Sequence, residues 1–342
     1  MGGSYGGRPF FVALLALTRS MALKGRNQRV AMVDFAALQM GGLNDKAGQD
    51  KPGQHFELTP QSLFNIDYIA PPARLSDYVT TLYHFRCDEA VIRDIQPASV
   101  GHLAIFPHGK GEMQFRDGRV DPSHETNLLT PFSVAAPFVV QGPFHAIGAV
   151  LSPYGWAALT GLDASKFGNR FVQASKWLDP SVDDLGAELC AAYRDGSMSG
   201  EDCANALGDF ILTHALKVNT RHAELIRQTN QWLGSSLNPA LDDLTASAAY
   251  SHRQVQRLVE RYFGVPPTAL ARKYRALRAA ALLSFPQLTP EYEAELGEAF
   301  YDQSHMIKEL RAFVGRTPAR LSDDEAPYLT EMLDLTNFRE LG

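Results

Sequence analysis

Apolar residues follow two different periods along this chain. From about residue 56 to 155, β-branched and aromatic residues gather in short runs separated by proline and glycine, which is typical of strands in a sandwich or barrel. We expect strands at 78–87, 101–107, 111–118, 132–142 and 145–153, with a hairpin turn at "FPHGKGE" (106–112). After Pro153 the period becomes helical, and from about 221 onward the pattern predicts helices only.

Within the helical part, the pattern from 238 to 264 predicts two helices joined by a tight turn. Asn238 and Pro239 have the residue types of an N-cap and a first helical position. Ser251 and Gln254 have the spacing of a capping box, so the second helix begins after Ser251. Gly264 stands where a left-handed residue ends a helix. The second helix buries one apolar stripe and exposes a polar one. The buried stripe is Val255, Leu258, Val259 and Tyr262, and the exposed one is Arg253, Gln256, Arg257 and Glu260.

The same arrangement occurs again 51 residues later without a gap. Gly264 aligns with Gly315 and Pro267 with Pro318. In the second copy, Thr289 and Asp302 are the predicted N-caps of two further helices. The second of these exposes Gln303, Ser304, Ile307, Lys308 and Arg311. An internal repeat of a helix-turn-helix pattern is far more specific than a single copy.

Between the copies, residues 267–283 predict one long helix. Leu270, Tyr274, Leu277 and Ala281 form its apolar stripe, and four basic residues lie around the rest: Arg272, Lys273, Arg275 and Arg278. We expect this helix to be a spacer whose basic residues contact phosphate groups and no bases.

Charge is unevenly distributed along the 342 residues. The net charge is −6, but residues 250–283 hold seven basic residues and one acidic residue. A basic segment that carries arginine and glutamine near a helix N-terminus suits the major groove of DNA, where arginine binds guanine and glutamine binds adenine. A solvated polar helix face is the alternative for each copy taken alone.

Catalytic and metal-binding motifs are absent from the sequence. It contains no phosphate-binding loop, no H-E-x-x-H and no nucleophile elbow. Cys87, Cys190 and Cys203 are too far apart for a zinc site and fit reduced, structural thiols. The histidines of the strand region, His102, His108, His124 and His145, lack the spacing of a metal site. We therefore expect no cofactor, no metal and no enzymatic activity.

The N-terminal run "PFFVALLALT" (9–18) is too short to span a bilayer, and its flanks are poor for a signal peptide. We expect a cytoplasmic protein without membrane contact, whose first 55 residues pack little. Met21 and Met32 are alternative starts.

Two stretches carry a resemblance to a known family. "YSHRQVQRLVERYFGVPPTALARKYRALRAA" and "AFYDQSHMIKELRAFVGRTPARL" resemble the DNA-binding domain of the AraC/XylS transcription regulators, over about residues 222–324. The resemblance implies two helix-turn-helix lobes, joined by a long helix, that enter successive major-groove segments. It also implies RNA polymerase as a partner and suggests a small-molecule effector and a homodimer.

By position, the resemblance gives base contacts to Arg253, Gln256 and Arg257 in the first lobe and to Gln303, Ser304, Ile307 and Lys308 in the second. We expect phosphate contacts from Ser251, Arg261, Lys273 and Arg311. The sequence departs from the family at Ala299, where glycine is usual, and in the glutamates of 291–298, which oppose a phosphate backbone. Recognition by the second lobe should therefore be weaker.

The strand region resembles, more loosely, the cupin-like sensor domains that precede such DNA-binding domains. The expected fold is thus α+β: a β-rich, cupin-like or barrel domain followed by an all-α domain. The expected boundaries are an extension at 1–55, a sensor or dimerisation domain with C-terminal helices at 56–219, the DNA-binding domain at 222–324 and an acidic tail at 325–342. Six aromatic residues are candidates for an effector pocket, although most suit a core equally well: Phe106, Phe115, Phe132, Phe138, Phe144 and Trp156. The alternative function is a cupin-like enzyme or small-molecule-binding protein whose DNA-binding domain is degenerate.

Overall fold

A single antiparallel sheet forms the first part of the computed structural model, which describes residues 58–59, 63–284, 289–318 and 321. The strands occur in the order β1-β2-β7-β4-β6-β8, while β3 pairs with β7 and β5 pairs with β4. Their bounds are β1 Asn65–Ile69, β2 Val79–Cys87, β3 Val91–Gln96, β4 His102–Gln114, β5 Val120–Pro122, β6 Thr126–Leu129, β7 Ala136–Leu151 and β8 Phe171–Gln173. The predicted extension, the alternative starts and the acidic tail lie outside the described residues.

The expected hairpin turn at 106–112 is wrong. These residues lie inside β4, which pairs with β7 on both sides of Gly109. Gly109 has a φ of 77° and the register shifts next to it, so the glycine allows a bulge in one long strand where a turn was expected. Likewise, the runs at 132–142 and 145–153 form one strand, β7.

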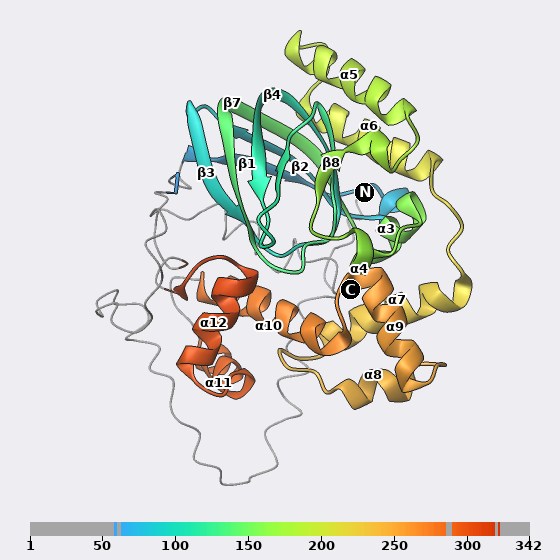
Figure 1. The fold of residues 1–342 in the computed structure, drawn as a ribbon, viewed down its shortest axis with the longest axis vertical. Helices are drawn as coiled ribbons and strands as arrows, with labels where there is room; N and C mark the ends of the chain where they lie inside the picture. The colour runs from blue at the N-terminus through green and yellow to red at the C-terminus, as the bar shows by residue number, and fades with distance from the viewer. Residues whose placement is uncertain (1–57, 60–62, 285–288, 319–320, 322–342) are drawn as a thin grey trace, which may run out of the picture. The chain divides into compact units, whose positions relative to one another are not determined.

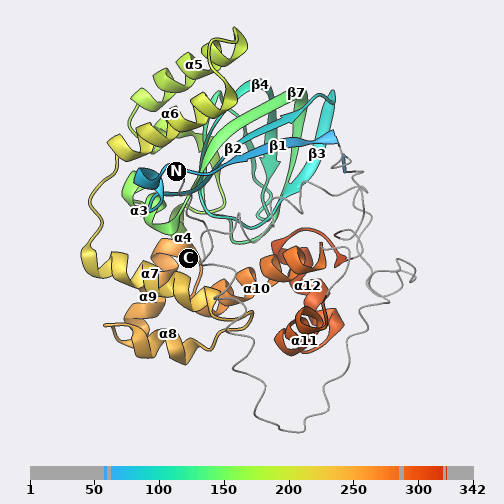
Figure 2. The same cartoon turned by 180° about the vertical axis from the view of Figure 1, so that it is seen from behind.

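Helices cover part of the sheet and then continue alone. After the short helices α3 (Pro153–Thr160) and α4 (Ala164–Phe167), helices α5 (Ser181–Arg194) and α6 (Gly200–Thr213) pack against β4 and β2 respectively. Figure 2 shows α5 and α6 side by side. Their buried faces share one core with the inner residues of β2, β4 and β7, including Leu82, Leu103 and Ile147.

From Thr220 onward, all the elements that the structure describes are helices, as expected. They are α7 Thr220–Gly234, α8 Leu241–Ser247, α9 His252–Phe263, α10 Pro267–Leu283, α11 Pro290–Ala299 and α12 Gln303–Phe313. Figure 1 shows α10 between α8 and α9 on one side and α11 and α12 on the other. Two short 3-10 helices, Ala73–Leu75 and Ala174–Lys176, complete the elements that the structure describes. The fold class predicted from the sequence, a β-rich domain followed by an all-α domain, is confirmed.

No helix in the described ranges is long and apolar enough to cross a bilayer.

Candidate functional site

Helices α8 and α9 form the first helix-turn-helix unit. At the start of α9, Gln254 Oε1 accepts a hydrogen bond from the backbone N–H of Ser251 at 3.0 Å, and the capping box is complete. Gly264 ends the helix in the left-handed conformation, with a φ of 84°. The predicted start of α8 is wrong, because the helix begins at Leu241 after Ala240. Asn238 instead accepts a hydrogen bond from Arg275 at 2.9 Å.

The two faces of α9 separate as the apolar stripe predicts. Val255, Leu258 and Val259 are buried in a cluster with residues of α7 and α10. Arg253, Gln256 and Arg257 are exposed together with Ser251 and Arg261. The three candidate base-contacting residues of the first lobe therefore lie on the accessible side of the helix.

Helices α11 and α12 form the second unit. Thr289 and Asp302 cap them as predicted, and Asp302 Oδ1 accepts from the backbone N–H of His305 at 2.7 Å. Met306, Leu310 and Phe313 are buried. Of the candidate base-contacting residues, Ser304 and Lys308 are exposed, whereas Gln303 and Ile307 are half-buried. Arg311, a candidate phosphate contact, is exposed.

A buried carboxylate that the sequence pattern did not single out fixes α12 to α10. Glu309 is 1% exposed and accepts hydrogen bonds from Arg272 at 2.7 Å and from Arg275 at 2.9 and 2.7 Å. Although burial raises the pKa of Glu309, the hydrogen bonds from Arg275 and Arg272 lower it more, so its pKa lies below the ordinary value. The guanidinium group of Arg275 also lies 5.1 Å from the ring centroid of Phe300.

The expected phosphate contact of Lys273 is contradicted by its position. Lys273 is 2% exposed, and its Nζ donates to the backbone carbonyl oxygens of Ser99 at 2.9 Å and Phe132 at 3.0 Å. Both residues lie between strands of the sheet, in the part of the chain that we call the sheet domain. The ammonium group of Lys273 is therefore hydrogen-bonded inside the protein. Arg275 is buried as well, so two of the four basic residues of α10 are not exposed to phosphate groups in this structure.

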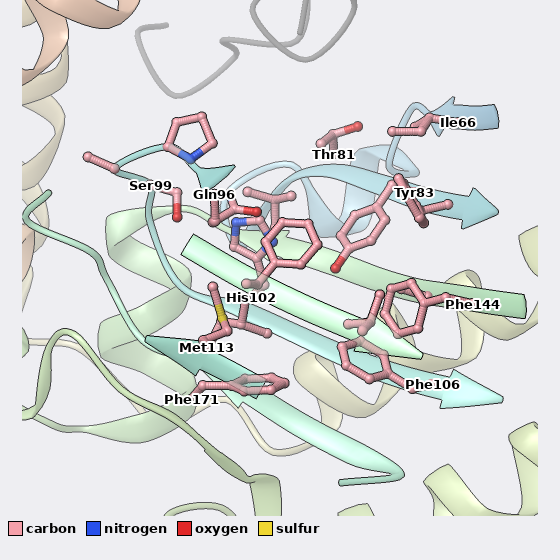
Figure 3. Close-up of a pocket in the computed structure, with 18 of the residues that line it drawn as sticks. Ile66, Thr81, Tyr83, Gln96, Ser99, His102, Phe106, Met113, Phe144 and Phe171 are labelled. Carbon is pink, nitrogen blue, oxygen red and sulfur yellow. The ribbon is translucent and has the colours of Figure 1, made fainter. Parts of the chain in front are cut away.

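A cavity of about 170 Å³ lies on the face of the sheet that is turned away from α5 and α6, where Lys273 and Leu277 of α10 close one side. Figure 3 shows Tyr83, His102, Phe106 and Phe144 pointing into it from neighbouring strands. The remaining lining residues are mostly apolar, among them Phe85, Met113, Leu129, Phe138, Val140 and Phe171.

Polar atoms gather at the α10 end of this cavity. The Oγ atom of Ser99 is buried and has no hydrogen-bond partner among the described residues. Burial, together with the charge of Lys273, lowers the pKa of His102 to about 4, so the imidazole is neutral at pH 7. Burial also raises the pKa of Tyr83 above its ordinary range, so the phenol stays protonated. The cavity thus offers His102 and Tyr83 as neutral hydrogen-bonding groups, beside the side chains of Lys273 and Glu112, within a mostly apolar lining.

Residues 244–323 match the family model described as "Helix-turn-helix domain". The match begins within α8 and extends past α12, so it includes most of the first unit, the whole of the second and the helix between them. The C-terminal segment is an AraC-type helix-turn-helix domain.

Solved structures similar to this chain include ToxT from Vibrio cholerae, at 10% identity and a TM-score of 0.42, over 75% of this chain and 97% of ToxT. ToxT bound to (E)-4-(8-methylnaphthalen-1-yl)but-3-enoic acid is similar at 11% identity and a TM-score of 0.42, over 79% and 99% of the two chains. The AraC-like transcriptional activator CuxR is similar at 12% identity and a TM-score of 0.30, over 64% and 87%. At these scores no property of ToxT or CuxR carries over to this chain. Among curated proteins, none matches it.

The aromatic candidates divide between the cavity and the core. Phe106, Phe138 and Phe144 line the cavity, whereas Phe115 and Phe132 are buried in a cluster beside it and Trp156 is in the main core. Sequence reasoning missed Tyr83, Ser99 and Lys273 as cavity residues. The alternation of side chains along β2 could have indicated Tyr83, since Tyr83 and Phe85 share one face of that strand. No local sequence pattern indicates that Lys273 of the AraC-type domain contacts the sheet.

Three histidines gather on other strand positions, away from this cavity. His84 Nε2 and His145 Nδ1 lie 2.9 and 2.8 Å from the hydroxyl oxygen of Tyr193 in α5, and the ring centroids of His108 and His145 are 4.8 Å apart. His108 of β4 and His145 of β7, which the sequence pattern did not bring together, therefore lie side by side. In the part of the chain that the structure describes, no group of three histidine, cysteine or acidic residues has an arrangement that could hold a metal ion.

Proposed function

We propose that this protein is a sequence-specific DNA-binding transcription regulator. The observation that supports it best is the family match over 244–323, which includes most of the first helix-turn-helix unit and all of the second. In each unit a capped helix exposes polar side chains near its N-terminus, where a major-groove helix contacts base edges.

In this proposal, Arg253, Gln256 and Arg257 contact bases from α9, and Gln303, Ser304, Ile307 and Lys308 contact bases from α12. Ser251, Arg261 and Arg311 contact phosphate groups, since all three are exposed beside these residues. Two recognition helices on one face of DNA would bind major-groove segments about 10 bp apart.

The second lobe should tolerate more base changes than the first. Its helix α11 carries Glu291, Glu293, Glu295 and Glu298, and carboxylates beside a phosphate backbone weaken binding. In addition, Gln303 and Ile307 are only half-exposed, whereas the three first-lobe residues are exposed.

We also propose that the cavity binds a small-molecule effector. An aromatic cavity with a few polar groups at one end is the usual form of a small-molecule site. The unpartnered hydroxyl group of Ser99 favours a largely apolar molecule that carries one hydrogen-bonding group. Partnership with RNA polymerase and formation of a homodimer stay predictions from the family resemblance.

Selection of bound duplexes from a random pool, at fixed salt concentration, tests the DNA-binding proposal. Enrichment of one motif with two halves about 10 bp apart is the expected result. The alternative, a small-molecule-binding protein with a degenerate DNA-binding domain, predicts that no motif is enriched while ligands still bind the cavity.

A further inference from the structure

Tyr301 is a large aromatic residue that lies almost entirely in solvent. It is 86% exposed, compared with 58% for Leu216, the next most exposed of the large apolar residues in the described ranges. It belongs to the turn between α11 and α12, and among the residues that the structure describes no hydrogen bond or ring contact involves it. Exposure alone assigns no role to this side chain, so its position in the fold decides.

The residues on both sides of Tyr301 direct its side chain outward. Phe300 has extended backbone, with φ −120° and ψ 139°, and is buried in the core cluster of α10, α11 and α12. Asp302 is also extended and is fixed as the N-cap of α12, where it accepts from the backbone N–H of His305. Since successive side chains of an extended chain point to opposite sides, the buried ring of Phe300 turns Tyr301 toward solvent.

The first unit uses the corresponding tyrosine differently. Tyr250 stands 51 residues before Tyr301, but it is half-buried and packs against the core cluster of α7 and α9. Its ring centroid lies 6.2 Å from that of His222 in α7. In the second copy, Lys273 stands 51 residues after His222, and its ammonium group is bound to the sheet domain. The second unit therefore has no histidine at that place, and the ring of its tyrosine is left exposed.

Tyr301 lies at the end of α12 that enters the major groove in the proposed function. The N-cap Asp302 follows it directly, and the exposed Ser304 lies in the first turn of the helix. In a helix-turn-helix unit the first helix crosses the DNA backbone while the N-terminal residues of the second contact base edges. The turn that joins the two helices, and Tyr301 with it, is therefore placed beside phosphate groups.

The N-caps of the two units differ in what they offer to a phosphate group. Ser251 carries a hydroxyl group, which can donate a hydrogen bond. Asp302 carries a carboxylate, which only accepts hydrogen bonds and repels phosphate. The neighbouring Tyr301 supplies a hydroxyl group in its place, and tyrosine is one of the side chains that bind phosphate oxygens.

We propose that Tyr301 is a further DNA contact, whose hydroxyl group donates a hydrogen bond to a phosphate oxygen beside the half-site of the second unit. This inference rests on the proposed function as a DNA-binding regulator. The contact holds α12 in position without reading a base, because contacts to phosphate and sugar carry no sequence information directly. Since the phenol is uncharged, the contact also releases no counterion, unlike a contact from arginine or lysine.

A pair of matched variants tests the inference. Tyr301→Phe removes the hydroxyl group and keeps the ring, and Tyr250→Phe makes the same change at the half-buried tyrosine of the first unit as a control. Fluorescence anisotropy gives Kd for the selected duplex and for duplexes with single base changes in the second half, at several salt concentrations. A further set of duplexes carries one neutral methylphosphonate group in turn at each backbone position of the second half. Circular dichroism verifies folding.

Tyr301→Phe should raise Kd by about threefold to tenfold, as for the loss of one hydrogen bond. The factor should be the same for every base sequence, and the slope of log K against log salt should stay as in the wild type. Tyr250→Phe should bind as the wild type does. One methylphosphonate group should weaken binding of the wild type but not of Tyr301→Phe, because both changes remove the same hydrogen bond.

Three results overturn the inference while the proposed function stands: an unchanged Kd for Tyr301→Phe, a loss confined to one base pair, or an equal loss for Tyr250→Phe. A loss confined to one base pair would make Tyr301 a base contact instead. If the wild type enriches no motif, the proposed function fails, and the phosphate contact of Tyr301 fails with it.

Discussion

Arg275 and Glu309 form a bidentate ion pair that joins α10 to the second recognition helix, with donor–acceptor distances of 2.9 and 2.7 Å. Both side chains are buried, at 8% and 1% side-chain exposure. Because bidentate geometry fixes direction as well as distance, this pair sets the orientation of α12 relative to α10. The stability of the second helix-turn-helix unit therefore depends on these two residues.

Removal of one partner of this pair should destabilise the protein strongly. Arg275→Met leaves Glu309 buried with fewer hydrogen bonds, and we expect a loss of about 3–5 kcal/mol in the free energy of unfolding. Urea denaturation measures it. The exposed pair Arg227–Glu224 on α7 supplies the control, because Arg227→Met should cost less than about 1 kcal/mol. Equal losses for the two variants would show that the buried pair has no special role.

Substitution of the first recognition helix should weaken specific binding. Arg257→Ala removes an exposed guanidinium group beside Arg253 and Gln256, and we expect a loss of about 1–3 kcal/mol together with relaxed preference at one base position. A titration of the selected duplex by fluorescence anisotropy tests this. Arg221→Ala on α7 should leave affinity nearly unchanged. Unaltered affinity and base preference in Arg257→Ala would remove the residue from the interface.

The salt dependence of DNA binding should distinguish Lys273 from Arg261. Arg261 is exposed, and Arg261→Ala should reduce the slope of log K against log salt by about 1, as expected for one lost phosphate contact. Lys273→Ala should leave that slope unchanged, because the ammonium group is bound to carbonyl oxygens of Ser99 and Phe132. Titrations at four or more salt concentrations give the slopes. A reduced slope for Lys273→Ala would mean that α10 leaves the sheet domain when DNA binds.

Stability should fall as the pH decreases from about 6.5 to 4. Burial lowers the pKa of His84 and of His102 to about 4, and the charges of Arg86 and Lys273, respectively, contribute to this shift. In the unfolded chain, the pKa of a histidine is about 6.5. Between about pH 4 and pH 6.5 the unfolded state binds more protons than the folded state, so the free energy of unfolding rises with pH. The stabilising contribution of the two neutral histidines is fully present above about pH 6.5.

We expect the wild type to lose about 1–3 kcal/mol between pH 7 and pH 5, measured by denaturant unfolding. His102→Gln should lose less over the same interval. His252→Gln, at an exposed position of α9, is the control and should follow the wild type. Identical losses for His102→Gln and the wild type would rule out His102 as a source of the pH dependence.

The two halves of the DNA site should differ in how much affinity is lost when a base is changed. Base-by-base substitution of the selected duplex should cost about 1–3 kcal/mol at positions contacted by α9 and less at those contacted by α12. The acidic helix α11 and the half-buried Gln303 and Ile307 are the reasons. Replacement of Glu291 and Glu293 by glutamine should raise affinity without changing the sequence preferred. Equal penalties in both halves would contradict the asymmetry.

The helical domain could be predicted from the sequence because its signals are local. Ser251 with Gln254, Asp302 and Gly264 each act within one turn of a helix, and the apolar stripe of α9 needs only the helical period. The start of α8 was misplaced because Asn238 has the residue type of an N-cap but is bound to Arg275, a partner that lies far along the chain.

Only the tertiary structure decided how the cavity and the buried charges are arranged. A basic residue on a helix has the same local pattern whether it meets phosphate or protein carbonyl groups, so Lys273 could not be told from Arg261 by sequence. Likewise, Asp94 and Arg316 form a buried ion pair although they are 222 residues apart, and no periodicity relates them. Their pairing follows from the packing of Phe313 and Gly315, at and after the end of α12, against Ile95 and Ala98, because buried polar groups take whichever partners the fold brings within reach.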